Sequence, residues 1–238
     1  MFEVISVSNL IEFFLRWFHF FFGVMWIGHL YYFNFTQGSF LNSTEVDNAA
    51  KSAVRIKLLP VALWWFKLGA LWTTITGLLY WGLKGHHSGN FSLFLQSSSG
   101  WLITAGALLG LTMFYNVWFV IWPNQQIVIK NAEAVAKGQA ANPAAAAAGA
   151  RANVASRTNT LFSLPMLFFM GASSHLPLPI SSSTNSLIFW IPFLLIWAAI
   201  EFNALKGQTG KFMTTVRQVL ISGFVLSGVL FGLVLISL

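Results

Sequence analysis

Residues 14–35 read FLRWFHFFFGVMWIGHLYYFNF, a run in which Arg16 is the only residue with a fixed charge. A bilayer crossing needs about 20 predominantly apolar residues, so this run is long enough to span a membrane as a helix. Five further runs of the same kind follow along the chain, at 59–83, 101–122, 159–175, 186–205 and 216–238. We therefore predict an all-α integral membrane protein, a single domain over residues 1–238 built as a bundle of six transmembrane helices.

The composition supports the same class. Of the 238 residues, 56% are hydrophobic and 8% are charged, and the mean hydropathy is +0.70, which is unlike that of a water-soluble globule. The chain has no cysteine, which excludes disulfides, thiolate-bound iron–sulfur clusters and the covalent attachment of a c-type haem. The first residues lack the basic segment and cleavage site of a secretory signal, so we expect the first helix to be retained as a span.

The basic residues predict the orientation. Ten of the 13 Lys and Arg residues lie in three connections, namely those after the first, third and fifth runs. Because Lys and Arg gather on the cytoplasmic side of a membrane, we expect both termini outside and residues 123–157 to form a long cytoplasmic loop. The expected location is the bacterial inner membrane. The net charge of +7 then reflects topology and contact with anionic lipid, and it gives no reason to expect a nucleic-acid partner.

Two histidines are the strongest candidates for chemistry. His19 lies about one helical turn inward of Arg16 in the first run, and His175 ends the fourth run. Because these two helices run in opposite directions, the two imidazoles are expected at similar depth. Imidazoles on facing helices can hold a haem from both sides, so we predict one b-type haem ligated by His19 and His175, with Arg16 at a propionate and Met170 as the substitute ligand. The alternative is that each histidine only hydrogen-bonds between helices.

A second polar level is expected nearer the cytoplasm, where His29, Lys67 and Glu201 fall within apolar runs. Ionisable residues inside a membrane are costly, and they often belong to functional sites. We predict a Lys67–Glu201 pair beside His29 that serves a proton path or a quinone or substrate contact. A purely structural ion pair is the first alternative, and His29 as ligand to a second haem is another.

Small residues recur at a spacing that brings helices close together. Gly106 and Gly110 are four residues apart in the third run, and Gly228 and Gly232 are four apart in the sixth. Such pairs permit close packing within the bundle or, alternatively, in a homo-oligomer.

Three stretches resemble a known family. Residues 16–33 (RWFHFFFGVMWIGHLYYF), 66–77 (FKLGALWTTITG) and 156–170 (SRTNTLFSLPMLFFM), followed by His175, are similar to the membrane domain of the bacterial membrane-bound urate oxidases, or urate hydroxylases. The resemblance implies that five residues occupy family motif positions: His19, Lys67, Arg157, Asn159 and His175. More distantly, a first-helix His with a second-helix Lys is similar to the small membrane protoporphyrinogen oxidases of bacteria, which bind b-type haem.

In the urate oxidase family, a c-type cytochrome domain follows the membrane domain and passes substrate electrons to respiratory oxidases. This chain ends after the sixth run, and His29 stands where we expect a small or neutral residue. The resemblance implies a redox protein that passes electrons from a membrane or small organic donor to a separate outward c-type cytochrome. Lys67, with Arg157 or Glu201, would handle protons or an anionic donor. The alternative is a haem-free scaffolding subunit of a larger respiratory or photosynthetic complex.

Overall fold

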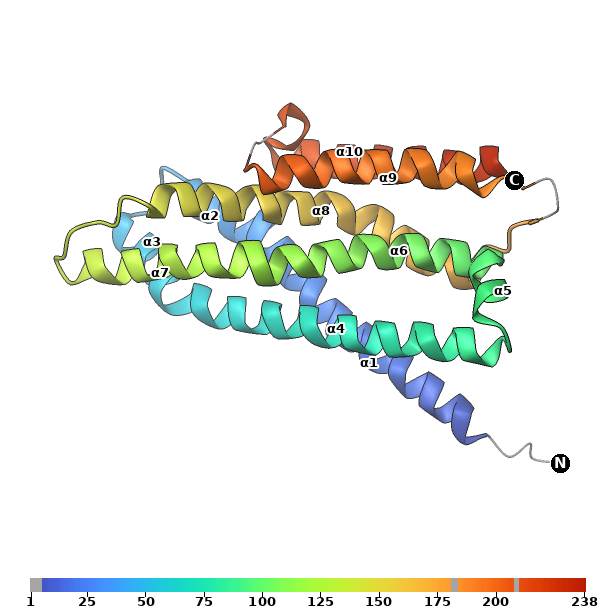
Figure 1. The fold of residues 1–238 in the computed structure, drawn as a ribbon. Coiled ribbons are helices and arrows are strands. Elements are labelled where there is room, and N and C mark those ends of the chain that lie inside the picture. The colour runs from blue at the N-terminus through green and yellow to red at the C-terminus, as the bar shows by residue number, and fades with distance from the viewer. Residues whose placement is uncertain (1–5, 181–183, 208–209) are drawn as a thin grey trace.

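The computed structural model describes residues 6–180, 184–207 and 210–238, and every regular element in these residues is a helix. Long helices run back and forth along one axis (Figure 1). The first joins α1 (Val7–Tyr31), η1 (Tyr32–Gln37) and α2 (Gly38–Asn42); the second joins α3 (Asn48–Ala53), η2 (Val54–Leu58) and α4 (Leu59–His87); the third joins α6 (Ser98–Tyr115), η3 (Asn116–Ile121) and α7 (Trp122–Ala136). After them come α8 (Ala145–His175), α9 (Ser186–Leu205) and α10 (Val216–Ser237), while α5 (Phe91–Gln96) and η4 (Lys211–Met213) are short.

Five of the described helices are long and apolar enough to cross a membrane, namely Val7–Asn42, Asn48–His87, Ser98–Ala136, Ser186–Leu205 and Val216–Ser237. The predicted all-α class is thus confirmed for the described residues, and the apolar helices fit a membrane protein. The remaining predicted span, at 159–175, lies in α8, which is not among these five. The six-span count therefore stays a prediction.

Helix α8 is less apolar than the five candidate spans because other helices surround it. It lies between α6 and α7 on one side and α9 and α10 on the other (Figure 1), and it contacts all four. Its side chains at Thr158, Asn159, Thr160 and Ser163 are fully buried. A helix enclosed by protein does not need an apolar surface, since its polar groups find partners on the neighbouring helices. Mean hydropathy is therefore a weak criterion for a membrane-spanning helix that other helices enclose.

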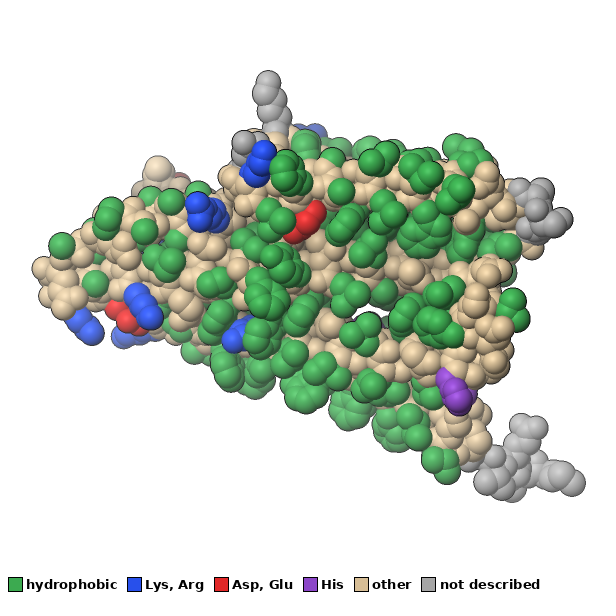
Figure 2. All heavy atoms as spheres, in the orientation of Figure 1, with side chains coloured by type: hydrophobic (Ala, Val, Ile, Leu, Met, Phe, Trp, Pro, Cys, Tyr) green, Lys and Arg blue, Asp and Glu red, His purple; other side chains and the backbone are tan. Residues whose placement is uncertain are grey.

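The connection predicted over residues 123–157 is much shorter than expected. Helix α7 continues to Ala136 and α8 already begins at Ala145, because the alanine-rich tract favours helix. The helix over Ser98–Ala136 has 39 residues, which is about 58 Å at 1.5 Å per residue and longer than a hydrocarbon core of about 30 Å. A helix of this length would extend past the hydrocarbon core of a bilayer. Lys and Arg side chains gather toward the end of the bundle where α7 is followed by α8 (Figure 2).

Helix α1 begins and helix α10 ends at the opposite end of the bundle, well apart from each other (Figure 1). Which side of the membrane they face remains the prediction made from the basic residues. Helix α1 packs mainly on α4, and its N-terminal half diverges from the bundle (Figure 1). There Phe13, Trp17 and Phe20 are exposed.

Glycines set the closest helix contacts. A Cβ at Gly69 of α4 would lie 3.0 Å from the main-chain nitrogen of Trp26, so α1 and α4 touch there at the level of the backbone. Gly106 of α6 similarly faces the main chain of Met170 in α8, where a Cβ would lie 3.3 Å from its nitrogen. The first predicted glycine pair therefore serves packing inside the bundle. At Gly228 and Gly232 nothing in the described structure lies within 4 Å of the position that a Cβ would take.

Candidate functional site

His19 lies in the contact between α1 and α4. Its Nδ1 is 2.9 Å from the main-chain oxygen of Thr73. Because a carbonyl can only accept, Nδ1 carries the hydrogen and Nε2 keeps its lone pair. A ring nitrogen with a lone pair, on an imidazole whose other nitrogen donates to a backbone carbonyl, is the usual arrangement of a metal-binding histidine. The ring also lies over Gly77, where a Cβ would come within 2.8 Å of Cε1.

A cavity of about 340 Å³ is lined by Arg16, which lies three residues before His19 in α1, but not by His19 itself. Its lining residues come from α1, α4, α5, α6 and α8, at the end of the bundle that we predict to face outward and call the outer end. Its lining residues are Arg16, Tyr80, Trp81, Lys84, Phe94, Ser99, Ile103, Ser173, Ser174 and His175. Two cationic side chains and one imidazole thus share a single cavity.

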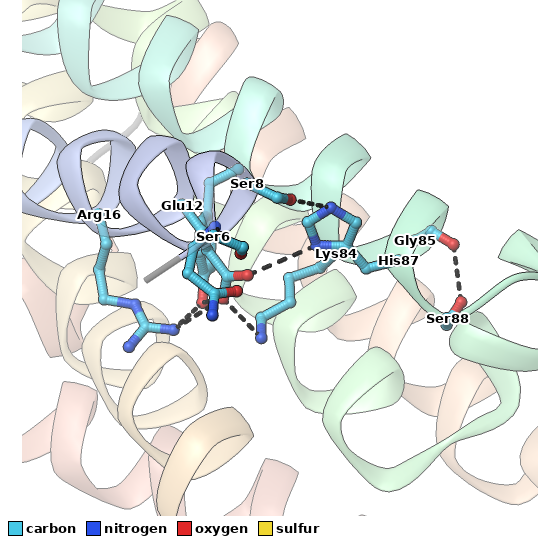
Figure 3. Close-up of polar contacts among 10 residues, drawn as sticks. Ser6, Ser8, Glu12, Arg16, Lys84, Gly85, His87 and Ser88 are labelled. Atoms are coloured by element: carbon cyan, nitrogen blue, oxygen red, sulfur yellow. Dashed lines mark hydrogen bonds and ion pairs between the residues drawn. The ribbon is translucent and has the colours of Figure 1, made fainter. Parts of the chain in front are cut away.

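Glu12 fixes the cations of this cavity, and the sequence reasoning missed it. Its Oε1 is 2.6 Å from Lys84 Nζ and 3.3 Å from Arg16 Nη2, and Arg16 also donates to the hydroxyl of Tyr80. Figure 3 shows Arg16 and Lys84 converging on Glu12, with His87 joining from α4. The spacing of Glu12 and Arg16, four residues apart on one helix, was the available signal.

His87 completes this network instead of remaining a free surface residue. Its Nδ1 is 3.6 Å from Glu12 Oε2, and its Nε2 is 2.6 Å from Ser8 Oγ (Figure 3). These contacts tie the diverging start of α1 to the end of α4. Glu12, Arg16, Lys84 and His87 together form what we call the outer ion network.

Of the two predicted axial histidines, only His175 lines the outer cavity. His175 is the last residue of α8, exposed at the cavity, while His19 lies inward of Arg16 and faces α4. No hydrogen bond joins the two imidazoles in the described residues. Arg16 and His175, predicted to bind one cofactor, line one cavity.

Met170 and His29 have local partners. Met170 packs against Gly106 of α6 within the hydrophobic core. His29 donates from Nδ1 to the main-chain oxygen of Met25, four residues earlier in α1, at 2.7 Å. Neither residue lines the cavity, so their predicted roles as substitute ligand and as ligand to a second haem gain no support from position.

Lys67 lies in a cage of indoles. Its Nζ is 4.1 Å from the ring centre of Trp118, 4.2 Å from that of Trp122 and 5.9 Å from that of Trp64. The predicted Lys67–Glu201 ion pair does not form, since no carboxylate of the described residues is within ion-pair distance of Lys67. Cation–π attraction takes the place of the expected partner.

Glu201 instead belongs to a buried amide cluster. Asn116 Nδ2 donates to Glu201 Oε2 at 3.0 Å and to Asn159 Oδ1 at 3.0 Å. Asn116 opens η3, a π-helical turn, and such turns often mark functional positions. Sequence reasoning missed Asn116, although an asparagine in the middle of an apolar run was a visible signal. Asn159, a motif position by resemblance, is part of this cluster.

Arg157 of α8 makes hydrogen bonds to the main chain of a neighbouring turn. Its Nη1 donates to the main-chain oxygens of Met213, at 2.7 Å, and of Thr214. These bonds fasten α8 to the turn between η4 and α10. The guanidinium is partly buried, and it does not contact Lys67 or Glu201 in the described structure.

Some residues that could hold a haem line the outer cavity, whereas His19 is not among its lining residues. His19 offers a free Nε2, His175 offers a second imidazole, and Arg16 and Lys84 offer positive charge for propionates. Three-residue groups of His, Cys, Asp or Glu that could hold a bare metal ion are not found among the described residues.

Comparison with known proteins gives one match. A family model described as urate oxidase N-terminal matches residues 90–230, more than half of the chain. The matched part runs from α5 into α10 and includes Asn116, Arg157, His175 and Glu201, whereas His19 and Lys67 precede it. No curated protein and no solved structure matches the chain.

Proposed function

Because this chain belongs to the urate oxidase N-terminal family, we propose that it is a membrane-embedded redox protein that binds b-type haem and passes electrons to an outward c-type cytochrome. The electrons would come from a membrane or small organic donor. The proposed location is the bacterial inner membrane, with the cavity end of the bundle outward. The family match supports the urate-oxidase-like domain, and the haem is our own inference from the site.

The observation that carries the proposal is the state of His19. Its Nδ1 hydrogen is committed to the Thr73 carbonyl, which orients the ring and leaves Nε2 as a lone-pair donor. That free Nε2 is the candidate iron ligand. The cavity lined by Arg16, three residues before His19 on α1, has two cations and a second imidazole in its wall.

When bound, a haem supplies a one-electron redox centre. The chain's own residues would hold it: His19 and His175 at the iron, and Arg16 and Lys84 at the propionates. Glu12 holds both cations on the cavity side of α1 and α4. A redox centre near the outer end of the bundle is within reach of a soluble cytochrome, which suits transfer to an outward partner.

At the inner level, Lys67 is the candidate contact for an anionic donor. Its ammonium has aromatic partners in the described structure, so its charge is not neutralised there by a carboxylate. Arg157 is assigned a structural role, because main-chain carbonyls already occupy its guanidinium. Glu201 has an amide partner instead of a cation, so we do not assign it to the Lys67 contact.

The test is cytochrome reduction in vesicles. The wild-type protein is reconstituted with a short-chain ubiquinol or with urate as donor, and reduction of an added c-type cytochrome is followed optically. We expect reduction with one donor, its loss in His19→Ala, and its retention in His86→Ala, a nearby exposed histidine. Equal rates in wild type and His19→Ala would contradict the proposal.

A haem-free structural subunit is the second candidate. The observation that favours it is that Asn116, Asn159 and Arg157 all bind groups on neighbouring helices or turns. Interhelical hydrogen bonds of this kind hold membrane bundles together. A well-folded wild-type protein without bound haem, recovered only with partner subunits, would favour this candidate.

A further inference from the structure

Two buried polar side chains, Asn116 and Glu201, are joined by one hydrogen bond and each keep one oxygen without a partner. Asn116 of η3 is fully buried and Glu201 of α9 is 7% exposed. Asn116 Nδ2 donates to Glu201 Oε2 at 3.0 Å. The other oxygen of each side chain, Asn116 Oδ1 and Glu201 Oε1, is buried and has no hydrogen-bond partner in the described structure.

The orientation of the Asn116 amide is fixed by its neighbour. Asn159 Nδ2 donates to the main-chain oxygen of Met113 at 2.9 Å, and a carbonyl can only accept. Asn159 Oδ1 must therefore face Asn116, and it needs a donor, which Asn116 Nδ2 supplies at 3.0 Å. Turning the Asn116 amide over would break both of its bonds, so Nδ2 stays on Asn159 and Glu201, and Oδ1 is the atom left without a donor.

Two acceptors thus lack a donor at the same place. An ionised carboxylate has acceptors only, and it is costly to bury without a cation. No Lys, Arg or His nitrogen of the described residues lies within ion-pair distance of Glu201. Asn159 Nδ2 donates to the Met113 carbonyl, and it makes no hydrogen bond to either of these two oxygens in the described structure.

We propose that Glu201 is a proton-binding site, occupied in the resting protein. A hydrogen on Oε1 would donate to Asn116 Oδ1, while Asn116 Nδ2 donates to Oε2. The carboxylic acid and the carboxamide then form a closed ring with two hydrogen bonds. One added proton satisfies both orphan acceptors and removes the buried charge, which is the arrangement by which proteins keep a carboxyl group neutral at neutral pH.

The site lies where three helical segments meet: η3 with Asn116, α8 with Asn159 and α9 with Glu201. A proton held there can be taken up or released when the packing of these segments changes. This inference does not depend on haem. It concerns residues away from the outer cavity, so its failure and the failure of the redox proposal are separate results.

The test is infrared spectroscopy of the full-length protein in detergent at neutral pH. A protonated carboxyl group has a carbonyl band that is separate from the carboxylate bands. We expect this band in wild type, its loss in Glu201→Gln, and its retention in Glu133→Gln, which changes an acidic residue of α7 outside the cluster. A wild-type spectrum without the band, or a band that survives in Glu201→Gln, would overturn the proposal.

A second measurement guards against a folding artefact. Glutamine offers the same donor and acceptor pair as a protonated glutamate, so Glu201→Gln should keep the ring and melt within experimental error of wild type. Glu201→Leu should melt lower, because it leaves Asn116 unpaired on that side. A Glu201→Gln melting temperature as low as that of Glu201→Leu would contradict the ring.

Discussion

The imidazole of His19 in α1 lies over Gly77 of α4, so close that a Cβ at position 77 would be 2.8 Å from Cε1 and 3.0 Å from Nδ1. The same ring donates to the carbonyl of Thr73, four residues before Gly77. One turn of α4 therefore provides both the hydrogen-bond acceptor and the space that orient His19. Any side chain at position 77 has to move the ring.

Gly77→Ala should be destabilising even though alanine favours helix. The added methyl would push the His19 ring and cost about 1–3 kcal/mol through overpacking, against a gain in helix propensity of about 1 kcal/mol. Gly82→Ala in the same helix is the control, because nothing lies within 4 Å of its Cβ position. Thermal unfolding in detergent measures both. A Gly77→Ala protein as stable as Gly82→Ala would show that the ring is not held tightly.

Lys67→Met should weaken the bundle and change its fluorescence. The ammonium contacts Trp118 and Trp122, and a cation–π pair contributes about 0.5–2 kcal/mol. We expect a lower melting temperature and a shifted tryptophan emission, measured beside Lys57→Met, whose side chain is exposed on the same long helix. Identical emission in the two variants would argue against the indole cage.

Arg157→Ala should loosen the turn before α10. Hydrogen bonds from a charged donor contribute about 1.5–3 kcal/mol, and this guanidinium makes two of them, to Met213 and Thr214. We expect faster proteolysis in the segment between α9 and α10, with Arg157→Lys intermediate because it lacks the planar fork. Asn153→Ala, an exposed change on α8, serves as control. Unchanged cleavage in Arg157→Ala would point to a role in chemistry instead.

Glu12→Gln should lower the melting temperature modestly, and high salt should remove the difference from wild type. Arg16 and Lys84 are 45% and 41% exposed in their side chains, and exposed ion pairs contribute about 0.2–1 kcal/mol each. We expect the variant to melt a few degrees lower at low ionic strength and to approach wild type in about 1 M salt, where charges are screened beyond about 3 Å. A difference that persists at high salt would mean that the outer ion network acts by packing.

The parts of the fold predictable from sequence are those that face lipid. Long apolar runs predicted α1, α4, α6, α9 and α10 because a lipid-facing surface has to be apolar along its whole length. The run at 159–175 was predicted as a span in the same way, but α8 is not among the five candidate spans, since burial among other helices permits Thr158 and Asn159 in its interior positions. The inner extension of α7 and α8 was also missed, because periodicity within an alanine-rich tract distinguishes poorly between a loop and a helix.

The site was predictable in its residue types but not in its pairings. Arg16 and His175 line one cavity as the antiparallel arrangement of their helices suggested. The ion pair expected between Lys67 and Glu201 was wrong, because spacing gives depth in the membrane but not the direction in which a side chain points around its helix. Lys67 points to Trp118 and Trp122, while Glu201 points to Asn116.

The most direct measurement is a reduced-minus-oxidised optical spectrum of the purified wild-type protein beside His19→Ala, His175→Ala and His86→Ala. We expect a b-type haem signal in wild type and in His86→Ala, and its loss in both His19→Ala and His175→Ala. A folded wild-type protein without the signal, or a signal that survives in His19→Ala, would contradict haem binding between these two histidines.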